Sequence, residues 1–152
     1  MSSSWFEKNS GMRISITVPG EPVAKARPRF TKTGHVYTPK KTAYFETAVK
    51  MLAMRAMKSK QPIRGAVSLS VSFFLPIPQS WSLTKKTQAI AGKLRHTKKA
   101  DLDNLVKSIS DGMNGIVFAD DAQIDVIHAR KHYSTEPRTE IVVEAEDDTQ
   151  GM

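Results

Sequence analysis

The chain has 152 residues, no cysteine and a formal net charge of +8. This length fits one domain, and the lack of thiols excludes disulfide bonds, cysteine nucleophiles and Cys-ligated zinc. The sequence contains neither a run of about 18 apolar residues, as a membrane span requires, nor the apolar core of a secretory signal. We therefore expect one cytoplasmic domain over residues 1–152, with flexible ends at residues 1–12 and 147–152.

The first predicted strand covers residues 13–18, where polar and apolar side chains alternate. Residues 25–39 are basic and contain a glycine where a tight turn would stand, which indicates a loop or an irregular hairpin. A helix is predicted to follow, with Thr38 as its cap and Pro39 as its first residue. Apolar residues at helical spacing extend this helix to about Lys58.

Residues 67–75 form the clearest predicted strand, because apolar residues occupy alternate positions and serines fill most of the others. A short helix or an ordered loop is expected over residues 81–91, and a second long helix over residues 101–114. Two final strands are predicted at residues 123–133 and 139–146. This order of elements predicts an α+β domain in which helices pack on a small mixed β-sheet.

Charge is distributed unevenly along the chain. Residues 1–100 carry 19 Lys and Arg against 3 Asp and Glu, whereas residues 101–152 carry 4 against 12. The basic part favours an anionic partner, either nucleic acid or an anionic membrane, over a simple solubility coat. Six of the 15 acidic residues fall between positions 101 and 125. Such a cluster in a basic molecule indicates a divalent-metal site on a surface that binds a polyanion.

Asp101 and Asp103 stand at the start of the second long helix, and Asp120 and Asp121 follow its end. Each has an ordinary explanation, as a helix cap or as a turn residue. If three of these carboxylates meet, their mutual repulsion requires a cation, and oxygen ligands suit Mg²⁺, with Mn²⁺ as a substitute. Lys107, one helical turn after Asp103, then either stabilises charge on a scissile phosphate or simply pairs with Asp103.

The basic segment near the N-terminus contains Lys25, Arg27 and Arg29, followed by Phe30. Cations beside an aromatic ring are typical of an arm that grips phosphates and stacks on bases. A solvated basic loop explains the same residues equally well. The histidines show no zinc-like spacing in the predicted elements, so no role is assigned to them.

Two acidic motifs resemble the signature of the RusA family of Holliday-junction resolvases. The first reads Asp-Leu-Asp-Asn-Leu-Val-Lys at residues 101–107, and the second reads Asp-Asp-Ala-Gln-Ile at residues 120–124. Residues 25–30, 37–39 and 73–78 resemble that family as well, so the likeness covers about residues 13–145. The combination of the two motifs is specific, whereas either motif alone is weak.

This resemblance implies a RusA-like fold and a homodimer that binds four-way DNA junctions and nicks two strands symmetrically, with Mg²⁺ as cofactor, in DNA recombination or repair. It implies that Asp101, Asp103 and Asp121 ligate the metal and act in catalysis together with Lys107. Asp121 is preferred to Asp120 because it matches the second acid of the family's pair. Members of the family are often encoded by phages or prophages.

Two other functions fit parts of the sequence. A non-catalytic basic DNA-binding module would use its acidic residues only as helix caps. A metal-dependent phosphatase acting on small phosphoesters fits the acidic residues but leaves the basic first hundred residues unexplained. A junction endonuclease accounts for both, and DNA contacts are then predicted at Lys25, Arg27, Arg29, Lys98 and Lys99.

Overall fold

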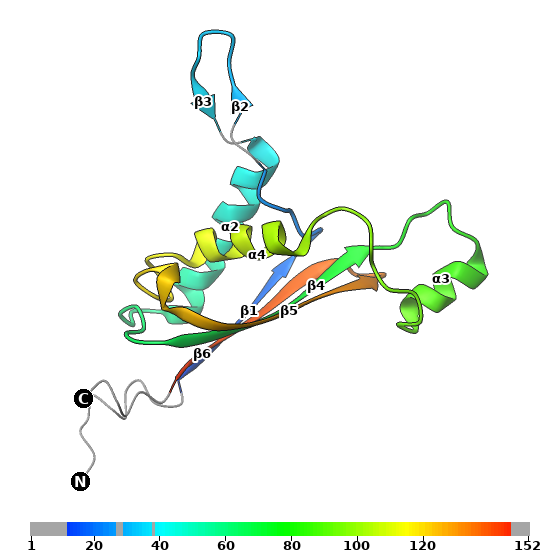
Figure 1. Ribbon diagram of the computed structural model, residues 1–152. Coiled ribbons are helices and arrows are strands. Elements are labelled where there is room, and N and C mark those ends of the chain that lie inside the picture. Colours follow the sequence, from blue (N-terminus) through cyan, green and yellow to red (C-terminus); the bar gives the residue numbers. More distant parts are fainter. Residues whose placement is uncertain (1–11, 27–28, 38, 147–152) are drawn as a thin grey trace.

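A four-stranded mixed β-sheet forms the centre of the protein, whose computed structural model describes residues 12–26, 29–37 and 39–146 (Figure 1). The strands stand in the order β1 (Arg13–Pro19), β6 (Arg138–Ala145), β4 (Val67–Pro76) and β5 (Ile124–Ser134). Strand β6 runs antiparallel to both of its neighbours, and β4 and β5 are parallel. Parallel neighbours need a long crossover, which explains why two helices separate β4 from β5 in the chain.

Two helices, α2 (Lys40–Met57) and α4 (Leu102–Met113), cover one face of the sheet (Figure 1). The strands turn their buried side chains toward this layer, because alternate residues of a strand point to the same face. The core combines these strand residues with one stripe from each helix, including Phe45, Val49, Leu105 and Ile109. The predicted α+β class and the mixed sheet with packed helices are confirmed.

Helices α2 and α4 approach closely at Gly112. A Cβ atom built there would lie 2.7 Å from Val49 Cγ1 and 3.0 Å from the carbonyl oxygen of Glu46. A glycine therefore lets the backbone of α4 lie against α2 without a side chain between them. This contact fixes where α4 crosses the helix layer, and with it the positions of the acidic residues around α4.

A short hairpin extends away from the helix layer (Figure 1). It consists of β2 (Arg29–Phe30) and β3 (Val36–Tyr37), joined through a turn in which Gly34 has a φ of +88°. Of the two alternatives predicted for this basic segment, a loop or an irregular hairpin, the structure has the hairpin. Phe30 is 72 % exposed, so its ring is available for contact with a partner.

The segment 81–91, predicted as a short helix or an ordered loop, forms helix α3 (Leu83–Ile90). Ser82 caps it by accepting a hydrogen bond from the backbone N–H of Lys85 at 3.2 Å. The start of α2 differs from the prediction, because Pro39 is the residue before the helix and not its first residue. The predicted cap, Thr38, lies outside the described residues.

The ends expected to be flexible also lie outside the described residues, apart from Met12. Within the described parts of the chain, no helix combines the length and the apolar character that crossing a membrane requires.

Candidate active site

The start of α4 carries two carboxylates that the fold leaves accessible. Asp101 precedes the helix in an extended conformation, and its side chain makes no capping hydrogen bond. Asp103 lies in the first turn and accepts a hydrogen bond from the backbone N–H of Asn104 at 3.0 Å. Both side chains are exposed. The capping explanation for Asp101 therefore fails, and both carboxylates remain available to bind a cation.

The segment just before α4 is held against β5. The ammonium of Lys131 donates hydrogen bonds to the carbonyl oxygens of Lys98 at 2.9 Å and Ala100 at 3.0 Å. Because Lys131 belongs to the later half of β5, the start of α4 lies beside that half of the edge strand. Asp101 thus has a fixed position relative to the sheet.

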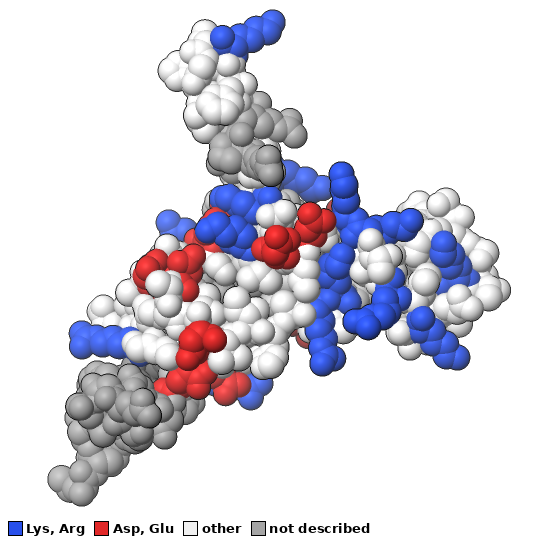
Figure 2. All heavy atoms as spheres, in the orientation of Figure 1, with Lys and Arg blue, Asp and Glu red and all other residues white. Residues whose placement is uncertain are grey.

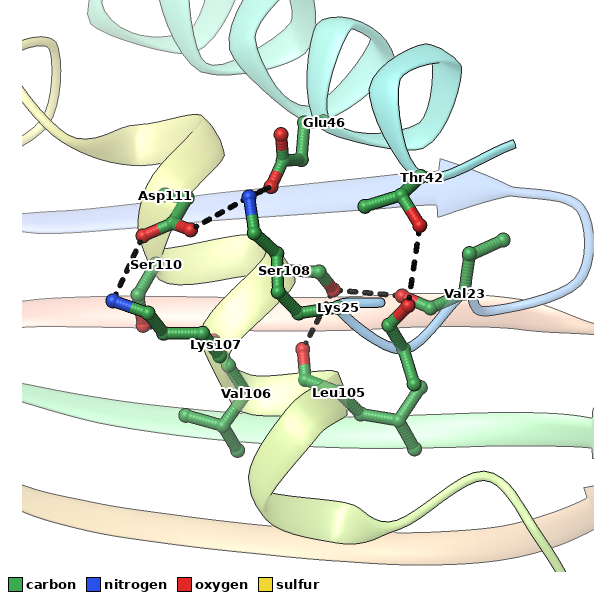
Figure 3. Close-up of polar contacts among 11 residues, drawn as sticks. Val23, Lys25, Thr42, Glu46, Leu105, Val106, Lys107, Ser108, Ser110 and Asp111 are labelled. Atoms are coloured by element: carbon green, nitrogen blue, oxygen red, sulfur yellow. Dashed lines mark hydrogen bonds and ion pairs between the residues drawn. The ribbon is translucent and has the colours of Figure 1, made fainter. Parts of the chain in front are cut away.

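Lys107 does not pair with Asp103, the partner that its spacing also allowed. Its ammonium lies 3.3 Å from Asp111, one turn further along α4 (Figure 3). The side chain of Lys107 is 54 % exposed. An exposed pair of this kind is weak, so Lys107 can leave Asp111 for a phosphate at little cost.

Asp111 also holds Lys25, which reaches in from the segment after β1 (Figure 3). The Lys25 ammonium lies 3.2 Å from Asp111 and forms a second ion pair with Glu46 of α2. The hydrogen bond to Glu46, and then the one to Asp111, raise the pKa of Lys25 above its ordinary value of 10.5 against the opposing effect of burial. Lys25 therefore ties α2 to α4, a role that sequence reasoning missed because both partners are distant in sequence.

Asp120 and Asp121 lie beyond the other end of α4, in a turn that Gln123 holds in place. The side-chain nitrogen of Gln123 donates to the carbonyl oxygens of Ile63 and Gly65, both at 2.8 Å, and its oxygen accepts from the backbone N–H of Asp120 at 3.0 Å. Gln123 is thus a positioning residue for the acidic pair. Its place in the second acidic motif was the only sequence signal of this role.

The two acidic pairs do not meet within one chain. Asp101 stands at the N-terminal end of α4, and Asp121 begins the short 3-10 helix η1 (Asp121–Gln123) that follows the C-terminal end of α4 (Figure 1). A helix of the length of α4 spans about 18 Å. Among the described residues, no group of three or more Asp, Glu, His or Cys side chains could hold a metal ion. A complete three-carboxylate site thus requires a further contribution from outside the described residues.

The chemistry of the donors at the start of α4 nevertheless fits Mg²⁺. The candidate ligands, Asp101 and Asp103, offer only carboxylate oxygens, the ligands that hard divalent cations prefer. One chain offers two such side chains at this point, and Mg²⁺ usually keeps several waters and binds one or two carboxylates together with phosphate oxygens.

The predicted DNA-binding residues fall into separate places. Lys98 and Lys99 are exposed just before α4, and Arg29 begins the hairpin. Arg27 lies outside the described residues. Lys25, by contrast, has its ammonium between two carboxylates. Figure 2 shows Lys and Arg side chains gathered over the region that joins α3 to the sheet.

Comparison with known proteins finds similarity over most of the chain. Residues 19–144 match the family described as Endodeoxyribonuclease RusA. The chain is also 39 % identical over 135 residues to YqaN of Bacillus subtilis (strain 168), a protein named as uncharacterized. That match covers 86 % of this chain and 94 % of YqaN.

Proposed function

Because the chain belongs to the RusA endodeoxyribonuclease family, we propose that it is a Mg²⁺-dependent homodimeric endonuclease that resolves four-way DNA junctions by paired nicks. The observation that carries the proposal is a pair of accessible carboxylates at the start of α4, neither of which caps the helix, in a chain of net charge +8. A basic surface supplies affinity for the DNA backbone, and this affinity should fall steeply as salt rises.

Asp101 and Asp103 would hold Mg²⁺ at the start of α4. Bound there, Mg²⁺ would polarise the scissile phosphate and lower the pKa of a bound water. Lys107 lies one turn along the same helix and is exposed, so its ammonium can leave Asp111 and face a phosphate at this point. It would then stabilise the negative charge that develops as the phosphodiester is hydrolysed.

A homodimer offers a way for the acidic pair at residues 120–121, which lies far from Asp101 within one chain, to take part in the site. Strand β5 stands at the edge of the sheet, and Val126 and Ile127 in its first half are 38 % and 49 % exposed. An edge strand with exposed apolar side chains is a surface suited to pairing with a second chain. We place the contact between the two copies at this edge.

An antiparallel pairing of two β5 strands centred on Val126 and Ile127 would set residue 121 of one copy opposite His132 of the other. The neighbouring Lys131 contacts Ala100, so this position lies beside the start of α4. Asp121 from one copy could thus join Asp101 and Asp103 from the other. Each dimer would then contain two such sites related by a two-fold axis, which matches the two symmetric nicks.

The function is tested by incubating the purified protein with a synthetic four-way junction and with a linear duplex of the same length, with Mg²⁺ or with a chelator. We expect paired nicks in the junction with Mg²⁺ only, and intact linear duplex. Metal-independent retardation of the junction without nicks would instead identify a non-catalytic DNA-binding module. Release of phosphate from small phosphoesters without any nicking would identify a phosphatase.

A further inference from the structure

A cleft of about 930 Å³ lies between the end of α3, the segment that follows it, and the later half of β5. It is separate from the carboxylates at the start of α4 but adjoins them, because Leu102, the first residue of α4, forms part of its wall. Its volume falls in the range of about 300–1,000 Å³ that is usual for clefts that enclose small-molecule ligands. Of its lining residues other than Leu102, the proposed function refers only to Lys131 and His132, which mark where Asp121 of a second copy would lie.

The charged residues that line this cleft are all positive. Arg95, Arg130 and Lys131 line it, and no Asp or Glu is among its lining residues. In the described parts of the chain, none of these three cations takes part in an ion pair. Lys131 donates only to neutral backbone carbonyls, so its charge is not cancelled. The cleft therefore suits an anionic ligand.

Flat rings form much of the rest of the wall. Phe74 and His132 stack with their centroids 5.0 Å apart and an angle of 21° between their planes, and His96 lies 4.8 Å from the ring of Tyr133. Burial, and then a neighbouring cation in each case, lowers the pKa of both histidines, with Glu140 opposing this effect at His132, and the lowered pKa favours the neutral rings. Neutral rings are suited to stacking against the face of another ring.

The cleft thus offers cations for phosphates and rings for stacking. The Nδ1 atom of His96 makes no hydrogen bond with the described residues, but it is buried and is not one of the groups that a ligand in the cleft would contact.

We infer that this cleft binds unpaired nucleotides of the DNA strand beside the phosphate that is cut. Cations that follow a backbone, combined with rings on which bases stack, are the features of single-strand binding sites, whereas duplex DNA keeps its bases stacked on one another. The inference rests on the proposed function, because the cleft would guide a strand that opens at the junction toward Asp101 and Asp103.

The test measures binding in the presence of a chelator, so that cleavage plays no part. A fluorescently labelled oligothymidylate and a labelled duplex are titrated with the full-length protein, with Arg130→Ala, and with Arg55→Ala as a control. Arg55 is an exposed arginine on α2, away from the cleft. Each variant therefore loses one positive charge, but only Arg130→Ala loses it from the cleft. We expect Arg130→Ala to weaken single-strand binding about tenfold and Arg55→Ala to change it little.

A second pair of variants examines stacking. His132→Phe keeps a ring at this position and should bind the single strand as tightly as the unaltered protein. His132→Ala removes the ring and should bind the single strand about tenfold more weakly. Equal losses in Arg130→Ala and Arg55→Ala, or equal binding by both His132 variants, would overturn the inference while nicking by the unaltered protein remains. Single-strand binding by the cleft in a protein that never nicks junctions would refute the proposed function, and with it the place of the cleft beside a cut phosphate.

Discussion

The two ends of α4 use the same residue type in different ways. At its start, Asp101 makes no capping hydrogen bond and Asp103 bonds only to the neighbouring backbone N–H. Near its last turn, Asp111 is held by the ammonium groups of Lys25 and Lys107. The comparison teaches that a carboxylate available for chemistry differs from a structural one in its partners and not in its sequence context.

The largest difference between the two ends is expected in catalysis. Asp103→Asn should reduce junction nicking on the order of 10³-fold while leaving junction binding and thermal stability unchanged, because a metal ligand is lost but the asparagine oxygen can still accept the hydrogen bond from the backbone N–H of Asn104. Asp111→Asn is the matched control, with the same change of charge on the same helix. Comparable nicking by the two variants, measured in single-turnover assays, would show that Asp103 contributes no more to cleavage than Asp111 does.

The next largest effect concerns stability at the far end of the helix. Gly112→Ala places a Cβ atom 2.7 Å from Val49 Cγ1, so α2 and α4 must move apart. We expect a loss of about 1–3 kcal/mol in the free energy of unfolding, measured by urea denaturation. If the variant is as stable as the unaltered protein or more so, the two helices are not fixed at this crossing.

A smaller loss of stability is expected at Ser108, between the two ends. Its buried hydroxyl lies 2.8 Å from the carbonyl oxygens of both Val23 and Leu105, which fastens the segment before Lys25 to α4 (Figure 3). Ser108→Ala should lower the free energy of unfolding by about 1 kcal/mol. The same denaturation assay checks this, and an unchanged midpoint would mean that the segment is held without the hydroxyl.

The smallest effect is expected from Asp111→Asn on stability, about 0.5 kcal/mol, because the side chains involved are partly exposed and Glu46 still holds Lys25. The pKa of Lys25 is raised in the folded protein, so the stabilisation is complete below pH 10.5, its ordinary pKa, and is lost as the pH rises through the folded value. The difference between the two proteins should therefore shrink above pH 10.5. A difference that grows with pH would contradict this network.

Much of the fold follows from local patterns in the sequence. Alternation of serine and apolar residues identified β4, and α4 falls within the helix predicted over residues 101–114. The parallel pairing of β4 with β5 has no local signature, because it depends on where the intervening helices pack. Likewise, spacing alone allowed Lys107 to pair with either Asp103 or Asp111, and only the packed structure decides between them.

The sequence proposes residues for the candidate site but does not predict their geometry. The acidic motifs pointed to Asp101, Asp103 and the pair at residues 120–121, yet whether these meet depends on how the turn after α4 is held. Gln123 holds that turn to residues 63–65, which keeps Asp121 beyond the last end of α4. A contact between two copies of the chain lies beyond any pattern in one sequence.

The central claim is that one copy supplies Asp101 and Asp103 and its partner supplies Asp121. It is tested by forming mixed dimers from Asp103→Asn and Asp121→Asn chains, each of which should be inactive alone. A mixed dimer would contain one intact site, so the account predicts single nicks in junction DNA with Mg²⁺. Verified mixed dimers that bind the junction but never nick it would contradict the shared site.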